Sequence, residues 1–144
     1  MNILISVDMS TTSARAVDTV RRLFPHQGLR VVVLHVAEPD PSFVGWEAGP
    51  EVVRDQLADL YRHARREVEA MAASLSDDGI DATGLTIQGA IVDTVLAEAA
   101  RIEADLIVVG SHGHGAAFNL VIGSVSSGII KKTAVPVLVV PDVR

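Results

Sequence analysis

The chain has 144 residues, of which 49% are hydrophobic but only 3% aromatic, and its 18 acidic and 12 basic residues give a net charge of −6. This length is typical of one domain, so we expect a single domain over residues 1–144. An acidic chain with few aromatic side chains would be repelled by nucleic acid and by anionic membranes, so the composition argues against both as partners.

Cysteine is absent, and the start of the sequence has no basic leader. Without cysteine there are no disulfides and no thiolate ligands for a metal. The apolar runs are much shorter than the roughly 18 residues that indicate a membrane span. We therefore expect a soluble, cytoplasmic protein with neither a signal peptide nor a membrane helix.

In the first half of the chain, strand patterns alternate with helix patterns. The continuous apolar runs Asn2–Val7 and Leu29–Val36 predict two strands. An amphipathic segment between them predicts a helix that ends at Phe24-Pro25, because the residue before a proline is disfavoured in helical conformation. Apolar residues at steps of four and three predict a long helix over Glu51–Leu75.

The second half continues the alternation. Leu85–Gln88, Asp105–Val109 and Val135–Val140 read as strands, and helices are expected from about Val92 to Ile102 and over Ser124–Thr133. The order βαβαβαβαβ predicts an α/β fold: a doubly wound, five-stranded parallel sheet of Rossmann-like type with helices on both faces.

Ligands of such sheets bind beyond the carboxyl ends of the strands, where the strand order reverses. Asp8 follows the first predicted strand and Gly110 follows the fourth, so we expect a crevice between them. Asp8 is either a ligand for the bound molecule or a cap for the first helix.

The segment after the fourth strand is rich in glycine, with Gly110, Gly113 and Gly123 spaced by two and nine residues. Glycine allows the backbone to approach a ligand closely, and the first amides of a helix bind phosphate oxygens. These glycines are either turn residues or a phosphate cradle. Ser124 could cap the following helix and also touch a phosphate, and Gly128 is interpreted as a helix-packing contact.

Three better-known glycine motifs fail at a residue that their chemistry needs. A Walker phosphate loop requires a lysine, and none occurs between Asp105 and Ile130. A dinucleotide fingerprint requires a glycine where Phe118 stands, and a hydrolase nucleophile elbow around Ser126 requires one at Ser124.

The spacing Gly110, Gly113, Gly123-Ser124 resembles the ATP-binding signature of the universal stress protein family. The segments Ile3–Ser10, Leu34-His35-Val36 and Pro136–Val140 resemble its first, second and fifth strands. The resemblance covers nearly the whole chain, apart from 37–50. It implies binding of ATP, or of AMP or ADP, with magnesium or manganese.

The resemblance also implies roles for individual residues. Asp8 would reach the ribose or a divalent ion on the phosphates, and the main chain of Val36 would read the adenine edge. The residues expected around the phosphates are Gly110, His112, Gly113, His114, Gly123, Ser124 and Val125. The family's ATP-binding members often have a basic residue where His114 stands here.

Three other features have alternative interpretations. His112 and His114 are two histidines with no third ligand type nearby, so they are better read as loop residues that meet the phosphate tail than as a metal site. Trp46 either covers the nucleotide or packs on the core. The arginines at 62, 65 and 66 alternate with acidic residues and indicate a solvated helix face.

Phosphoryl transfer needs fixed positive charge at the transferred group, and the glycine-rich segment has neither lysine nor arginine. The expected function is therefore a nucleotide-binding regulatory protein of the stress response with slow hydrolysis at most. Pairing of the edge strand Val135–Val140 with its copy would make a homodimer. The alternatives are a structural dimer of the same family that binds no nucleotide, and an enzyme that acts on a nucleotide; any protein client is unknown.

Overall fold

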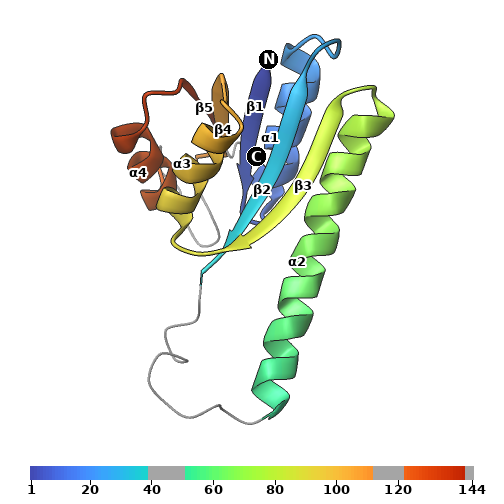
Figure 1. The fold of residues 1–144 in the computed structure, drawn as a ribbon, viewed down its shortest axis with the longest axis vertical. Coiled ribbons are helices and arrows are strands. Elements are labelled where there is room, and N and C mark those ends of the chain that lie inside the picture. Colours follow the sequence, from blue (N-terminus) through green and yellow to red (C-terminus); the bar gives the residue numbers. More distant parts are fainter. Residues whose placement is uncertain (39–50, 112–121, 142–144) are drawn as a thin grey trace.

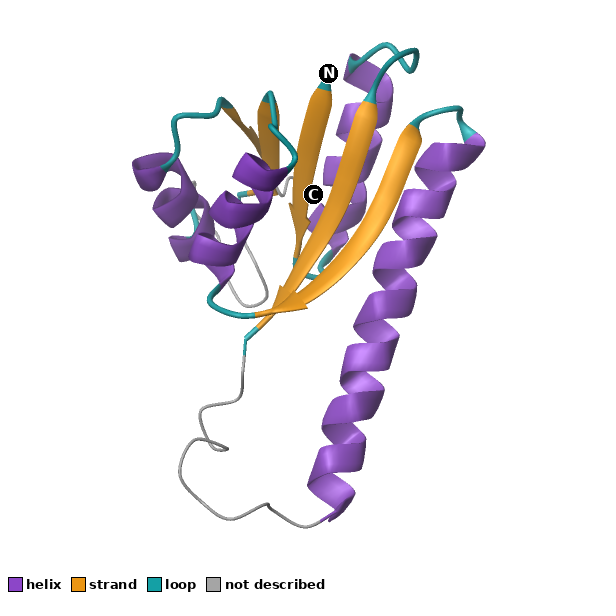
Figure 2. Cartoon of the chain, in the orientation of Figure 1, coloured by secondary structure: helices purple, strands orange, loops and turns teal. Residues whose placement is uncertain are grey.

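The computed structural model describes residues 1–38, 51–111 and 122–141 (Figure 1). Five strands alternate with four helices along this part of the chain (Figure 2). In chain order they are β1 (Asn2–Val7), α1 (Thr11–Leu23), β2 (Arg30–Ala37), α2 (Glu51–Asp77), β3 (Asp81–Gln88), α3 (Ile91–Arg101), β4 (Leu106–Gly110), α4 (Ser124–Lys132) and β5 (Val137–Val140).

The strands form one parallel sheet in the order β3-β2-β1-β4-β5. From β1 the chain moves outward to β2 and β3, and then returns to add β4 on the other side of β1. This reversal confirms the predicted doubly wound α/β architecture, and it makes β3 and β5 the two edge strands.

Each face of the sheet is covered by a pair of helices (Figure 1). On one face Val20 of α1 and Val68 of α2 are buried against residues such as Ile5. On the other face Val95 of α3 and Ile129 of α4 are buried in the second apolar cluster. Because successive side chains of a strand point to opposite faces, continuous apolar strands supply both layers of core.

The predicted bounds differ from the structure most at β3, which begins at Asp81 rather than at Leu85. Its first four residues, Asp-Ala-Thr-Gly, have weak strand propensity, but they pair with β2 from Arg30↔Asp81 onward. A Cβ on Gly84 would lie 2.9 Å from the Val68 carbonyl oxygen, so glycine here allows α2 to lie close to the strand.

At the other edge, β5 begins at Val137 rather than at the predicted Val135. Pro136 has no N–H for the ladder, although its carbonyl accepts from the Ile107 N–H at 2.9 Å. The described helices include none that is both long and apolar enough to cross a bilayer.

Candidate functional site

The carboxyl ends of β1 and β4 lie side by side at the point where the strand order reverses. Their last registered pair is Ser6↔Val109. Continuing this register by two residues brings Asp8 level with Ser111, the first residue after β4. The structure therefore brings together the two chain segments that the sequence predicted as the walls of a crevice.

Asp8 organises the turn from β1 into α1. Its Oδ1 accepts hydrogen bonds from the Ser10 N–H at 3.1 Å, the Ser10 hydroxyl at 2.5 Å and the Ser13 hydroxyl at 2.9 Å. Met9, between Asp8 and Ser10, has φ 65°, a left-handed conformation that is uncommon outside glycine. Asp8 thus organises the turn before α1 without capping the helix: the N-cap is Ser10, and among the described residues no side chain accepts from the first helical amides.

Ser13 was not among the candidate residues, yet its hydroxyl forms two hydrogen bonds with Asp8. The Ser13 hydroxyl donates to Asp8 Oδ1 at 2.9 Å and accepts from the Asp8 N–H at 3.0 Å. The side chain is buried, with 3% of Ser13 exposed. These bonds fix the carboxylate of Asp8 at the carboxyl edge of the sheet.

Two hydrogen bonds join the segment that leaves β4 to the segment that enters α4. The Ser126 hydroxyl donates to the Gly110 carbonyl at 2.6 Å, and the Gly123 N–H donates to the Ser111 carbonyl at 2.7 Å. Ser111 in turn donates its N–H to the Val140 carbonyl at 2.8 Å. The start of α4 is therefore attached directly to the end of β4, and through Ser111 to the end of β5.

The first turn of α4 presents main-chain donors at this edge. The N-cap residue is Gly123, with φ −59° and ψ 162°, so Ser124 is the first helical residue and not the N-cap that the sequence suggested. Glycine has no side chain to accept from the first amides of a helix, which lack intrahelical partners. The first turn has no acidic residue, and Lys131 and Lys132 lie in the last turn.

Packing against α3 fixes the position of α4. A Cβ on Gly128 would lie 2.8 Å from Val92 Cγ2, which confirms the interpretation of Gly128 as a helix-packing contact. At the end of the helix, Lys132 Nζ lies 3.0 Å from Asp93 Oδ1. Ser124 is exposed and Val125 is partly buried in the cluster beneath α3 and α4.

Val36 lies one residue beyond the end of β1, since the last pair of the two strands is Val7↔His35. The Ala37 carbonyl accepts from the Gly89 N–H at 3.0 Å, on the β3 side. Main-chain groups of successive residues in a strand point to opposite sides, so those of Val36 point toward β1. His35 also reaches this end, with its Nδ1 3.0 Å from the Val7 carbonyl.

Three of the expected site residues cannot be placed in the same way. His112, Gly113, His114 and the neighbouring Gly115 lie outside the described residues, as does Trp46. Ser13 and Ser126 were missed because their partners are main-chain or carboxylate oxygens that only the fold brings close. The run of serines after Gly123 is the sequence signal that could have indicated Ser126.

The architecture is that of a doubly wound α/β protein in which a helix begins at the strand-order reversal. A profile described as the Universal stress protein family matches residues 1–141. The chain therefore belongs to the universal stress protein family.

Individual relatives agree with this assignment over nearly their full lengths. A universal stress protein of Thermus aquaticus is 30% identical over 138 residues, covering 96% of both chains. The structure of MJ0577, a universal stress protein of Methanocaldococcus jannaschii, superposes with a TM-score of 0.87 at 26% identity, covering 99% of this chain and 96% of that one.

A universal stress family protein of Arabidopsis thaliana, solved with AMP bound, has a TM-score of 0.70 at 22% identity. It covers 98% of this chain, which covers 91% of the plant protein. At this identity the likeness shows a common fold.

Proposed function

We propose that the chain is a single universal stress protein domain that binds an adenine nucleotide, ATP or its diphosphate or monophosphate, at the carboxyl ends of β1 and β4. The observation that carries the proposal is the start of α4, which has no side-chain cap among the described residues and is hydrogen-bonded to Ser111, the residue level with Asp8 at the strand-order reversal. The AMP-bound relative from Arabidopsis supports the choice of an adenine nucleotide.

The phosphates would bind at the first turn of α4. Amides at a helix start carry partial positive charge and attract phosphate oxygens. Ser124 adds an exposed hydroxyl, and Val125 supplies an amide one residue further along the helix. Gly110 and Gly123 leave room for the phosphates, and His112, Gly113 and His114 would complete the cradle.

The nucleoside would extend from α4 across β1 to the end of β2. Asp8, held by Ser10 and Ser13, would accept from the ribose hydroxyls. The main-chain groups of Val36 point toward β1 one residue beyond its end, where they could pair with the adenine edge.

A divalent ion fits this site when it arrives with the phosphates. Magnesium is commonly held by one or two carboxylates together with substrate phosphates. Asp8 is one such carboxylate, whereas residues 1–38, 51–111 and 122–141 contain no cluster of three or more His, Asp or Glu side chains that could hold a metal alone. Magnesium or manganese would add positive charge at the phosphate tail.

The same residues favour binding over turnover. Efficient phosphoryl transfer uses a lysine or an arginine on the transferred group. The first turn of α4 reads Ser-Val-Ser-Ser, and its lysines lie in the last turn. We infer a cytoplasmic regulatory protein of the stress response that hydrolyses ATP slowly at most.

The partner we propose is a second copy of this chain. β5 lies at the edge of the sheet and pairs with β4 on one side. Antiparallel pairing of two such edges would cover their unpaired main-chain groups and give a two-fold symmetric dimer.

A pair of proline variants in β5 tests the dimer. The Pro136 carbonyl accepts from Ile107 of β4, and the Val140 carbonyl accepts from Ser111, which follows β4. The N–H of Val139 therefore points outward, and that of Leu138 points toward β4. Val139→Pro should give folded monomers by light scattering, whereas Leu138→Pro should lower thermal stability by damaging the ladder. A folded Val139→Pro variant that stays dimeric would contradict this interface.

Mass spectrometry of protein denatured directly after purification tests the nucleotide. We expect ATP, ADP or AMP in the released small molecules, and a rise in melting temperature when ATP and magnesium are added to emptied protein. Absence of both effects would contradict nucleotide binding and would favour a structural dimer of the family.

A further inference from the structure

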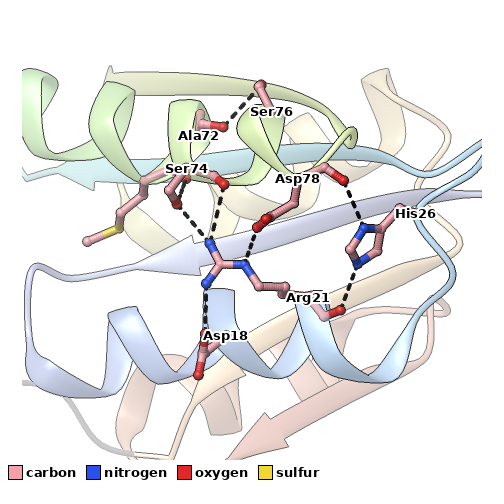
Figure 3. Close-up of polar contacts among 8 residues, drawn as sticks. Asp18, Arg21, His26, Ala72, Ser74, Ser76 and Asp78 are labelled. Atoms are coloured by element: carbon pink, nitrogen blue, oxygen red, sulfur yellow. Dashed lines mark hydrogen bonds and ion pairs between the residues drawn. The ribbon is translucent and has the colours of Figure 1, made fainter.

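His26 joins the carboxyl ends of two helices (Figure 3). It lies where the strands begin, at the end of the sheet opposite to the proposed nucleotide site. It lies in the connection between α1 and β2 and is partly buried. Its Nε2 is 3.0 Å from the Arg21 carbonyl oxygen, and its Nδ1 is 2.9 Å from the Asp78 carbonyl oxygen. Both ring nitrogens therefore face main-chain oxygens.

The first of these carbonyls belongs to the last turn of α1. In a longer helix the Arg21 carbonyl would accept from the N–H four residues later, but that residue is Pro25, which has no N–H. The His26 ring supplies the missing donor.

The second carbonyl belongs to the turn that ends α2. Gly79, with φ 83°, donates its N–H to the Ser76 carbonyl at 2.9 Å, and Ile80 donates to the Leu75 carbonyl at 3.1 Å. This is the Schellman arrangement, which closes a helix with a left-handed glycine. It leaves the Asp78 carbonyl pointing outward to His26 Nδ1.

The protonation state of the ring follows from these partners. A carbonyl oxygen can only accept a hydrogen bond, and a neutral imidazole has a single N–H. The neutral ring would therefore direct a lone pair at one of the two oxygens, whereas the imidazolium donates to both. The carboxyl ends of two helices also place partial negative charge around the ring, which favours the cation.

The charged side chains around His26 have opposite effects on the pKa of its ring. From the end of α2, the Asp78 carboxylate favours the cation, and from α1 the Arg21 guanidinium opposes it. Arg21 is held in turn by Asp78 Oδ2 at 2.6 Å, Asp18 Oδ1 at 2.8 Å and the Ser74 hydroxyl at 3.1 Å. At the start of β2, the Arg30 guanidinium pairs with Asp81.

The balance of these contacts favours the protonated ring. The hydrogen bond to the Arg21 carbonyl, and next the one to the Asp78 carbonyl, raise the pKa of His26 above its ordinary value of 6.5. Partial burial lowers the pKa, and the Asp78 carboxylate raises it further.

We propose that His26 is a proton-operated clamp: its protonated ring ties the carboxyl end of α1 to that of α2, and loss of the proton releases one of the two ties. Because the pKa is higher in the folded chain than in the unfolded chain, the clamp contributes its full stability below about pH 6.5. That contribution is lost as the pH rises through the folded-state pKa.

A histidine NMR titration of the wild-type chain tests the protonation directly. We expect two N–H groups on the His26 ring near neutral pH, and a midpoint above that of a histidine in an unstructured peptide. Loss of the signal in His26→Gln assigns it. A ring with one N–H and an unshifted or lowered midpoint would overturn the proposal.

Amide hydrogen exchange tests whether the proton acts as a clamp. After correction for intrinsic rates, protection of the Gly79 and Ile80 amides should fall in the wild-type chain as the pH rises through the His26 midpoint. The same amides in His26→Gln should show no such step, whereas His63→Gln, on the exposed face of α2, should behave like the wild type. Protection without a step in the wild type would contradict the clamp.

Discussion

The starts of α1 and α4 lie at the same edge of the sheet, but their amino ends are built differently. At α1, Asp8 Oδ1 accepts from the Ser10 amide and from two serine hydroxyls, so the chain supplies its own carboxylate. At α4 the N-cap is Gly123, and the first turn has no acidic residue. Among the described residues neither helix has a side-chain cap on its first amides. The difference is that a carboxylate of the chain stands at the turn into α1, whereas glycine and serine stand at the start of α4.

The carboxyl ends of the helices, at the opposite end of the sheet, differ from these amino ends, because side chains there contact the free carbonyls. His26 donates to the ends of α1 and α2, and Asn2 Nδ2 lies 2.8 Å from the Ile102 carbonyl at the end of α3. The side chains of this protein therefore complete several helix termini. Among the described residues no side-chain cap is formed at the amino ends of α1, α3 or α4. At α4, which begins after Gly123 at the strand-order reversal, the proposed phosphates would bind the first amides.

The largest effect is expected when α4 is given an internal cap. Gly123→Asp places a carboxylate where the phosphates would bind, and the extended backbone of Gly123 suits an aspartate cap. Calorimetry should show ATP affinity reduced by about 100-fold, or about 2.7 kcal/mol, while the free energy of unfolding rises by a few tenths of a kcal/mol.

Gly123→Val distinguishes steric blocking of the phosphates from capping of α4, because valine fills the space but has no side-chain acceptor for the helix amides. It should weaken ATP binding without the gain in stability. If Gly123→Asp bound ATP as tightly as the wild type, α4 would not be the phosphate site.

A smaller effect is expected when the hydrogen bond between α4 and the end of β4 is removed. Ser126→Ala removes the donor to the Gly110 carbonyl in a buried position, where 4% of Ser126 is exposed. Urea denaturation should show a loss of about 1–3 kcal/mol. Ser126→Thr keeps the hydroxyl and serves as the control; equal stability of the alanine variant and the wild type would contradict a stabilising tie.

The smallest effect is expected at the turn into α1. Asp8→Ala removes the acceptor of three hydrogen bonds in the turn before α1, and should cost about 0.5–1.5 kcal/mol of unfolding free energy. Asp8→Asn keeps one oxygen acceptor and should cost less. If both variants lost the same stability, the negative charge of Asp8 rather than its hydrogen-bonding oxygen would be responsible.

Much of the fold could be predicted because the strands are continuous apolar runs and the helices are bounded by local signals. β1 has the predicted bounds, and α1 ends at the Phe24-Pro25 signal. The first half of β3 could not be recognised, because Asp81 and Gly84 are poor strand formers. Asp81 is in the strand because it pairs with β2, and Gly84 allows the close contact with α2.

The site was predictable to the extent that strand ends and glycines mark it. Asp8, Gly110 and Gly123 follow from topology and spacing, and the structure brings their segments together. Ser13 and Ser126 act through hydrogen bonds formed by folding. The interaction of His26 with Asp78 spans 52 residues, and no sequence periodicity indicates it.

The most direct test of the central claim is a titration of ¹⁵N-labelled, nucleotide-free protein with ATP and magnesium, observed at the main-chain amides of α4. The amides of Ser124 and Val125 should shift and saturate at the affinity measured by calorimetry, and in Gly123→Asp they should not respond. ATP that bound without moving these two amides, or that did not bind, would contradict the account.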